Sequence, residues 1–313
     1  MIDRENNIDI IDSGLIRTNF AGTYLLESKK EVALVEVSTS HAKSQILRTL
    51  QSRNIKLEQI KYLFITHIHL DHAGGAGTMM ELFPNAKLIV HPSGSKHMID
   101  PSKLIAGANA VYGEDIVRKD YGTIVPISSS RVIEAKDGEE FNLGDRVLTT
   151  IHTPGHARHH MSIYDSKSQG IFTGDSFGLS YPEMTVNGNK FYQPTTTPTA
   201  FEMDKMIASI DKMLNFKPKK LFFTHYGVSS NPLETKKQII QRLSQYEKLT
   251  KESWDGTITD VKKLEDKLSD YYVKEGINHG VSLNRNKIRT LFNIDIKLNA
   301  MGLSLWYNRL MST

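Results

Sequence analysis

The stretch KYLFITHIHLDHAGG, residues 61–75, places three histidines and an aspartate directly behind a short apolar run. The run is typical of a strand that is buried on both faces of a sheet. A packed core has little use for three histidines so close together, because each ring carries two nitrogens that need partners. We therefore interpret His67, His69, Asp71 and His72 as ligand side chains at the end of a buried strand.

The spacing within this cluster indicates two binding positions. His67 and His69 are two residues apart, so in an extended segment both side chains point the same way and can hold one ion. Asp71 and His72 are adjacent and must face a second ion, and the two glycines that follow give the backbone the freedom to turn. Two ions about 3.5–4 Å apart can share a bridging carboxylate.

Three later segments repeat the layout of a short apolar run followed by a ligand side chain. They lead to His156, Asp175 and His225. Strands that end at one edge of a sheet would bring these side chains to the first cluster, and such edges are where ligand sites of α/β proteins form. Nitrogen and carboxylate ligands suit zinc, iron or manganese. We expect two divalent ions per chain, with zinc as the first choice.

Composition excludes several other classes of protein. The 313 residues are 39% apolar and 24% charged, which is typical of a globular protein. Cysteine is absent, which excludes a disulfide scaffold, a thiolate nucleophile and an iron–sulfur cluster. No apolar run is long enough for a membrane span and the N-terminus is too charged for a signal peptide, so we expect a cytoplasmic protein. The net charge of +4 is spread along the chain and gives no reason to expect nucleic-acid binding.

Periodicity predicts an αβ-rich part followed by an all-helical part. We place a metal-binding domain at 1–232 and a helical extension at 233–313 that shapes the substrate pocket or an interface. The loop 178–199 is longer than most connections and is a candidate lid. Predicted strands lie at 23–28, 31–38, 61–66, 87–91, within 130–151, in a hairpin over 162–173, and at 219–224; predicted helices lie at 42–53, 78–83, within 92–125, and at 201–214, 233–251, 258–274 and 283–311.

The chain resembles the metallo-β-lactamase superfamily. The family signature T-H-x-H-x-D-H is present at residues 66–72, and the later family ligands match HTPGHA, TGD and THYG. The resemblance covers roughly residues 10–230. It implies an α+β fold, the αββα sandwich, with a metal site at one edge of its two sheets and an added helical region behind it.

The resemblance also implies how the ligands divide. His67, His69 and His156 would hold one metal, and Asp71, His72 and His225 would hold the other. Asp175 would bridge the two ions. One departure is visible, because the family often has an aspartate after an early strand where this chain has Glu36. Glu36 either supports the site from behind the ligands or is a solvated carboxylate at a strand end.

Four further residues are candidates for substrate contact: His159, Tyr181, Glu183 and Tyr226. A tyrosine beside a metal ligand could stabilise an oxyanion. Asp71 is the candidate catalytic residue, because it could orient the nucleophile or carry a proton to the leaving group.

The segments HTPGHARHHMSIY and FTGDSFG resemble a subgroup of mostly uncharacterised archaeal and bacterial hydrolases, which includes the response thioesterase of the Pseudomonas quinolone signal system. Glyoxalase II is a looser relative. We therefore expect a dinuclear hydrolase that cleaves a small-molecule ester or thioester with a metal-bridging hydroxide. The alternatives are a mononuclear iron sulfur dioxygenase of the same superfamily and a metal-containing regulatory or binding protein. The amphipathic C-terminal segment leaves open whether the chain acts alone or as a homodimer.

Overall fold

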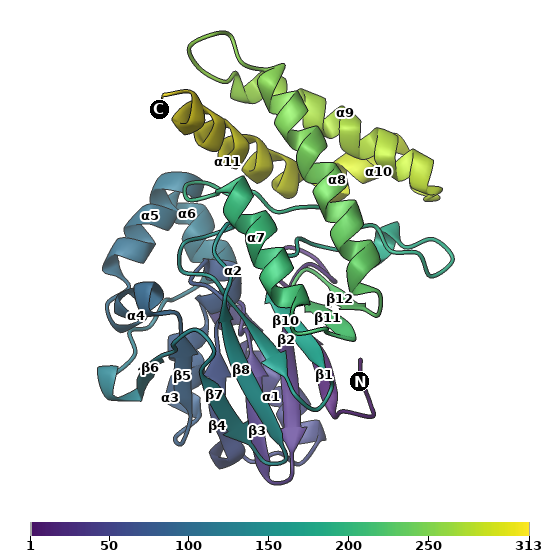
Figure 1. The fold of residues 1–313 in the computed structure, drawn as a ribbon. Helices are drawn as coiled ribbons and strands as arrows, with labels where there is room; N and C mark the ends of the chain where they lie inside the picture. The colour runs from purple at the N-terminus through teal and green to yellow at the C-terminus, as the bar shows by residue number, and fades with distance from the viewer. Residues whose placement is uncertain (1, 313) are drawn as a thin grey trace.

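The computed structural model describes residues 2–312 and contains two six-stranded sheets that pack face to face (Figure 1). Helices cover the outer faces of the sandwich, and the C-terminal helices gather at one end of it. The αββα sandwich with an added helical region, expected from the sequence, is therefore confirmed.

The strands are short, as expected for strands that cross a sandwich of this size. They are β1 (Ile8–Asp12), β2 (Gly22–Ser28), β3 (Glu31–Val35), β4 (Ile60–Phe64), β5 (Lys87–Val90), β6 (Val132–Glu134), β7 (Glu140–Leu143), β8 (Arg146–His152), β9 (Met161–Asp165), β10 (Gly170–Gly174), β11 (Lys220–Phe223) and β12 (Gly227–Ser229). The helices are α1 (Lys43–Ser52), α2 (Leu70–Ala73), α3 (Ala76–Leu82), α4 (Pro92–Ile99), α5 (Ser102–Tyr112), α6 (Glu114–Ile116), α7 (Met203–Leu214), α8 (Pro232–Lys251), α9 (Val261–His279), α10 (Arg285–Leu291) and α11 (Asn293–Met311).

The two sheets have matching layouts. One has the strand order β1-β2-β3-β4-β5-β6 and the other has the order β12-β11-β10-β9-β8-β7. In the first sheet β3 to β6 run parallel, and in the second β10 and β11 run parallel. Strands β4, β10 and β11 each end a few residues before candidate ligands, so the topology brings the loops that carry these ligands together.

Aromatic side chains fill the space between the sheets. Phe172 of β10 stacks on Phe222 of β11 with ring centroids 4.7 Å apart, and Tyr24 of β2 meets the Phe172 ring edge-on at 5.0 Å. The Tyr24 hydroxyl donates to the carbonyl oxygens of Phe223 and Gly227, at 2.7 and 2.8 Å, so its polar end is satisfied in the core. These contacts hold β2 of one sheet against β10 and β11 of the other.

A buried ion pair joins β8 to β9. Nη1 of Arg146 lies 3.2 Å from Oδ2 of Asp165, and both side chains are fully buried. The Asp165 carboxylate also accepts from the Ser168 hydroxyl at 2.6 Å. Because both charges are removed from water, each depends on the other for compensation.

The C-terminal helices share one apolar core with the second sheet. Leu243 of α8, Leu268 of α9 and Leu303 of α11 belong to the same buried cluster as Ile171 of β10 and Leu221 of β11. In Figure 1, α8 and α11 lie across the end of the sandwich, beyond α7. This shared core crosses the predicted domain boundary after residue 232. The boundary itself stays a prediction.

Most of the sequence-predicted elements are present, but β1, α2 and β12 were not predicted, and two other segments differ in detail. β1 was not predicted, because IDIID is short, carries two aspartates without regular alternation and lies next to a charged N-terminus, yet it pairs antiparallel with β2. The strand predicted over 31–38 ends at Val35, because Glu36 adopts a positive φ of 64°. The loop 178–199 contains one short helical turn at Pro182–Met184.

Candidate metal centre

Histidine and aspartate side chains from both sheets converge at one edge of the sandwich. The segment after β4 carries His67 and His69, and the short helix α2 carries Asp71 and His72. His156 follows β8, Asp175 follows β10 and His225 follows β11. The seven residues predicted as ligands thus form three overlapping groups. The first group is His67, His69 and His156, the second group is Asp71, His72 and His225, and the third, His67, His72 and Asp175, shares one residue with each of them.

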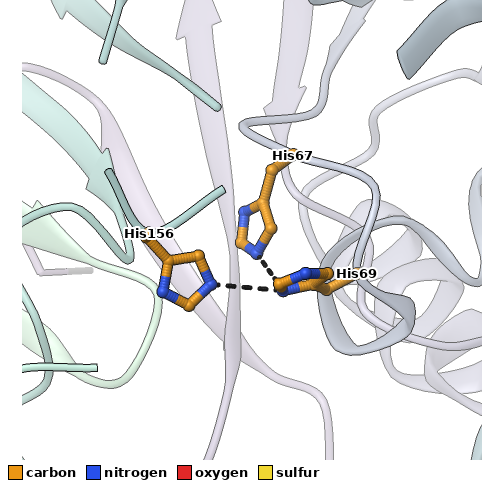
Figure 2. A group of neighbouring side chains, drawn as sticks. All are labelled: His67, His69 and His156. Atoms are coloured by element: carbon orange, nitrogen blue, oxygen red, sulfur yellow. Dashed lines mark hydrogen bonds between the residues drawn. The ribbon is translucent and has the colours of Figure 1, made fainter. Parts of the chain in front are cut away.

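Figure 2 shows the first group, in which three imidazole rings point toward one another. Nε2 of His67 lies 2.9 Å from Nδ1 of His69, and Nε2 of His156 lies 3.2 Å from the same atom. Within each group the ligand atoms lie within 4.8 Å of one another. The extended backbone at His69 allows this convergence, as the two-residue spacing predicted.

The Asp175 carboxylate lies between the first group and the second. Its Oδ2 is 3.5 Å from Nε2 of His156, and its Oδ1 is 3.3 Å from Nε2 of His72 and 3.6 Å from Nε2 of His225. Oδ1 is buried and makes no well-aligned hydrogen bond within the described residues. A buried carboxylate oxygen without such a bond is costly unless a ligand completes its environment.

In three of the histidines, Nδ1 faces an oxygen acceptor behind the ring, which leaves Nε2, the nitrogen that points into the centre, with its lone pair available. Nδ1 of His156 donates to the carbonyl oxygen of Thr195 at 3.1 Å, and Nδ1 of His225 donates to that of Phe20 at 2.8 Å. Nδ1 of His72 faces Oε1 of Glu36 at 3.1 Å. In each ring Nε2 is then free to bind a cation. The donor set and its outer contacts therefore fit divalent metal ions.

Charge in the centre favours a bound cation. Burial and the neighbouring histidines lower the pKa values of His67 and His69 well below the ordinary range, so both rings are neutral and can act as ligands. Burial opposes protonation of His72 as well, but Asp175, Asp71 and Glu36 outweigh it and raise the pKa of His72. These carboxylates thus draw positive charge to the side of the centre that His72 occupies.

Glu36 lies directly behind the second group. Its side chain is fully buried, which contradicts the alternative of a solvated carboxylate at a strand end. Besides contacting His72, it accepts from the Thr66 hydroxyl, and Oε2 lies 3.3 Å from the Thr66 amide nitrogen. The hydroxyl of Thr224 lies 3.5 Å from Oε1. Glu36 therefore connects the segments before His67 and before His225.

The predicted role of Gly74 and Gly75 was wrong in its physical reason. Both residues have negative φ angles, −58° and −85°, so the turn needs no left-handed backbone. Asp71 and His72 turn instead because α2 begins at Leu70. Gly75 is required by a close approach, since a Cβ there would lie 2.6 Å from the carbonyl oxygen of Thr39.

An apolar cavity of about 280 Å³ opens beside the first group. His159, one of the predicted substrate residues, lines this cavity next to His69 and His156, and burial lowers its pKa to about 4. The cationic side chain of Lys103 from α5 also lines it. The apolar part of the lining consists of Ile68, Leu70, Leu104, Ala108, Val111, Ala157, Pro198 and Ala200.

A second, smaller cavity of about 40 Å³ lies beside the second group, and we call it the inner cavity. Asp71, Asp175 and His225 line it from the sandwich. Helix α11 supplies the opposite wall, including Asp295, whose pKa is raised to about 6 by burial. The helical extension therefore reaches the ligand cluster itself.

Three of the four predicted substrate residues do not line either cavity in the described part of the chain. Tyr181 is fully buried, and its hydroxyl donates to Oδ1 of Asp295 at 3.0 Å. Glu183 pairs with Arg17 at 3.1 Å near the surface. Tyr226 is half-buried, and burial raises its pKa. Their contact with substrate stays a prediction.

Sequence reasoning missed Asp295 and the segment Thr195–Thr197 at the centre. Thr195 and Thr197 line the inner cavity, and the Thr195 carbonyl orients His156. Neither Asp295 nor the segment Thr195–Thr197 follows a buried strand, and that position was what identified the other candidate residues. Asp295 is one acidic residue in the first turn of a long helix and has no recognisable spacing.

Residues 19–225 match the model of the metallo-beta-lactamase superfamily, and the chain belongs to this family. The metallo-beta-lactamase fold-containing protein ST1585 of Sulfurisphaera tokodaii is 31% identical over 194 residues, which cover 61% of this chain and 69% of that protein. The crystal structure of ST1585 covers 91% of this chain and 99% of its own, with 26% identity and a TM-score of 0.61.

Two other proteins are similar to this chain, one in its solved structure and one in its sequence. The metallo-beta-lactamase family protein TTHA1429 of Thermus thermophilus has a TM-score of 0.68 at 17% identity and covers 98% of this chain and 94% of its own, which extends the likeness in fold to the C-terminal helices. The atrochrysone carboxyl ACP thioesterase of Aspergillus fumigatus is 26% identical over 52% of this chain and 42% of that protein.

Between residues 2 and 312, none of the helices combines the length and the apolar character that a membrane span requires.

Proposed function

We propose that this protein is a dinuclear metal-dependent hydrolase that cleaves an ester or thioester bond of a small molecule. The observation that carries the proposal is the position of Asp175 between two complete groups of ligand atoms. One group alone would suffice for a mononuclear centre. The second group, Asp71, His72 and His225, favours two ions over one.

The ligand residues would be shared between two metal ions. His67, His69 and His156 would hold one divalent ion, and Asp71, His72 and His225 would hold the other, with Asp175 between them. Ions held there would polarise a carbonyl group and supply hydroxide from water near neutral pH. Zinc is the first candidate, because imidazole and carboxylate ligands without thiolate suit it, and iron or manganese would also fit.

Asp71 would have a second task besides binding, and its contacts support this role. Its Oδ2 lies 3.3 Å from Nε2 of His225, and its side chain is about a quarter exposed and lines the inner cavity. The carboxylate is held ionised, because His72 and His225 lower its pKa against the opposing effect of burial. It can therefore accept a hydrogen bond from the attacking water and pass a proton to the departing thiol or alcohol.

The substrate class rests on the apolar cavity and on the thioesterase relative. A cavity lined mainly by aliphatic side chains next to His69 and His156 suits the hydrocarbon part of an acyl group. In the overall reaction water adds to the carbonyl carbon, the bond from that carbon to sulfur or oxygen breaks, and a carboxylic acid and a thiol or alcohol leave. A homodimer remains a proposal that the oligomeric state in solution would test.

Metal analysis of the purified protein and two variants tests the proposal. We expect about two divalent ions per chain in the wild type, and fewer in Asp71→Ala and His225→Ala, with hydrolysis of acyl-CoA thioesters lost in parallel. His279→Ala, which changes a half-buried histidine that belongs to none of the three ligand groups, should keep both ions. A single iron that survives both substitutions, together with oxygen consumption, would instead identify a mononuclear dioxygenase. Full metal content without turnover of any ester would favour a binding or regulatory protein.

A further inference from the structure

One carboxylate oxygen of Asp295 accepts a hydrogen bond from the protein and the other does not. Oδ1 accepts a hydrogen bond from the Tyr181 hydroxyl at 3.0 Å. Oδ2 is buried and has no hydrogen-bond partner among the described residues. The residue lies in the first turn of α11 and faces the inner cavity, across from Asp71 and His225. A buried carboxylate oxygen that lacks a partner is costly, so its retention beside a candidate catalytic centre indicates a ligand.

Asp295 is also held rigidly, as a recognition residue must be. One turn further along α11, Asn299 accepts from the Thr196 amide at 2.6 Å and donates to the Pro194 carbonyl at 3.2 Å and the Tyr272 hydroxyl at 3.0 Å. Gly302 continues this close contact, because a Cβ there would lie 1.5 Å from the Thr196 carbonyl oxygen. The helix is therefore locked to the segment that supports the metal centre.

The two cavities beside the centre differ in chemistry and meet at one residue. Thr197 lines both the apolar cavity and the inner cavity. The first has a volume of about 280 Å³ and the second only about 40 Å³, which is room for a water molecule or a small substituent. A substrate that spans both would place a hydrocarbon chain in the first and a small polar group in the second.

We propose that Asp295 determines substrate specificity by accepting, at Oδ2, a hydrogen bond from a hydroxyl or ammonium group that lies one or two bonds from the scissile carbonyl. The position follows from the lining of the inner cavity, since Asp71, Asp175 and His225 share it with Asp295. A carboxylate oxygen accepts from either donor and repels another acceptor. This inference rests on the proposed hydrolase function and specifies its substrate as an acyl thioester or ester with an apolar chain and a nearby donor.

The test compares three thioesters of one thiol, with octanoyl, 2-hydroxyoctanoyl and 2-aminooctanoyl groups. For the wild-type metalloprotein we expect kcat/KM at least tenfold higher for one or both donor-bearing substrates than for octanoyl. The pair of donors separates a hydroxyl from an ammonium group. Asp295→Asn is the decisive variant, because the Tyr181 hydroxyl keeps the amide oxygen at the Oδ1 position and an NH₂ donor then replaces Oδ2. The preference for the ammonium group should disappear or reverse, and the preference for the hydroxyl group should fall, since a hydroxyl can also accept from the amide.

Two controls separate this role from a structural one. Asp266→Asn changes an exposed aspartate on α9 and should leave the substrate ratios unchanged. Metal content and the thermal unfolding midpoint of Asp295→Asn should match those of the wild type. Calorimetric binding of the three free acids provides a readout that does not need turnover, and it should show the same preference and the same loss.

Each outcome decides the inference. Equal kcat/KM values and equal affinities for the three compounds in the wild type would overturn it, as would an unchanged preference in Asp295→Asn. If no thioester is cleaved, the proposed hydrolase function fails, and the affinities of the three acids alone decide the role of Asp295.

Discussion

Replacing Glu36 by glutamine should selectively weaken one of the two proposed metal sites, the one formed by Asp71, His72 and His225. Glu36 is fully buried. Its carboxylate accepts a hydrogen bond from the Thr66 hydroxyl and lies 3.1 Å from Nδ1 of His72. Hydrogen bonds to a charged acceptor contribute about 1.5–3 kcal/mol, against about 1 kcal/mol for a neutral one. Loss of such support behind a metal ligand typically lowers affinity about 10–100-fold, which corresponds to about 1.4–2.7 kcal/mol.

Chelator competition with zinc measures this effect site by site. In a His69→Ala background, which leaves the group of Asp71, His72 and His225, Glu36→Gln should raise the dissociation constant about 10–100-fold. In a His225→Ala background the group of His67, His69 and His156 remains, and none of these three side chains hydrogen-bonds Glu36, so the same change should have little effect. Glu81→Gln, on the exposed part of α3, is the matched control. Equal effects in both backgrounds, or none in either, would refute the reasoning.

Three further predictions concern stability. Burial lowers the pKa of His91 to about 4, so the imidazole stays neutral in the folded protein, whereas in the unfolded chain it binds a proton below about pH 6.5. The contribution of His91 to the free energy of unfolding is therefore intact above about pH 6.5 and should fall by about 1 kcal/mol, after allowance for partial exposure, as the pH drops toward 4. Urea titrations of His91→Asn should show a smaller fall. Gly302→Ala forces a methyl group against the Thr196 carbonyl, which should cost about 1–3 kcal/mol and lower the thermal midpoint, whereas an unchanged midpoint would show that α11 can shift freely. Arg146→Ala leaves Asp165 charged and unpaired in the core and should cost about 3–5 kcal/mol in urea unfolding; a loss below about 1 kcal/mol would mean that water reaches the pair.

The sequence was sufficient to predict the ligand cluster because each ligand follows a buried strand. A short apolar run marks the strand, and the topology of the sandwich carries the ends of β4, β10 and β11 to one edge. His156 and His225 are far apart in the chain, yet their place behind similar runs identified both. Local spacing and strand position therefore contained the geometry of the centre.

The parts that escaped prediction depend on contacts that leave no local pattern. Asp295 reaches the centre only because α11 packs on the 194–197 segment through Asn299 and Gly302. β1 becomes a strand because β2 offers a free edge, although IDIID has aspartates at positions 9 and 12 and lacks the regular alternation of an amphipathic strand. Tertiary packing decides both, and single-sequence periodicity cannot register it.

The distribution of the ligands over both sheets has a consequence for how the chain folds. Asp71 and His72 lie on α2, which follows β4 of the first sheet, whereas His225 follows β11 of the second. The second group therefore closes only when two halves distant in the chain have docked. Closing so long a loop is entropically costly and slow compared with local helix formation. Tight metal binding should therefore appear only in the last stage of folding, and a bound ion would stabilise the docked arrangement of the two halves.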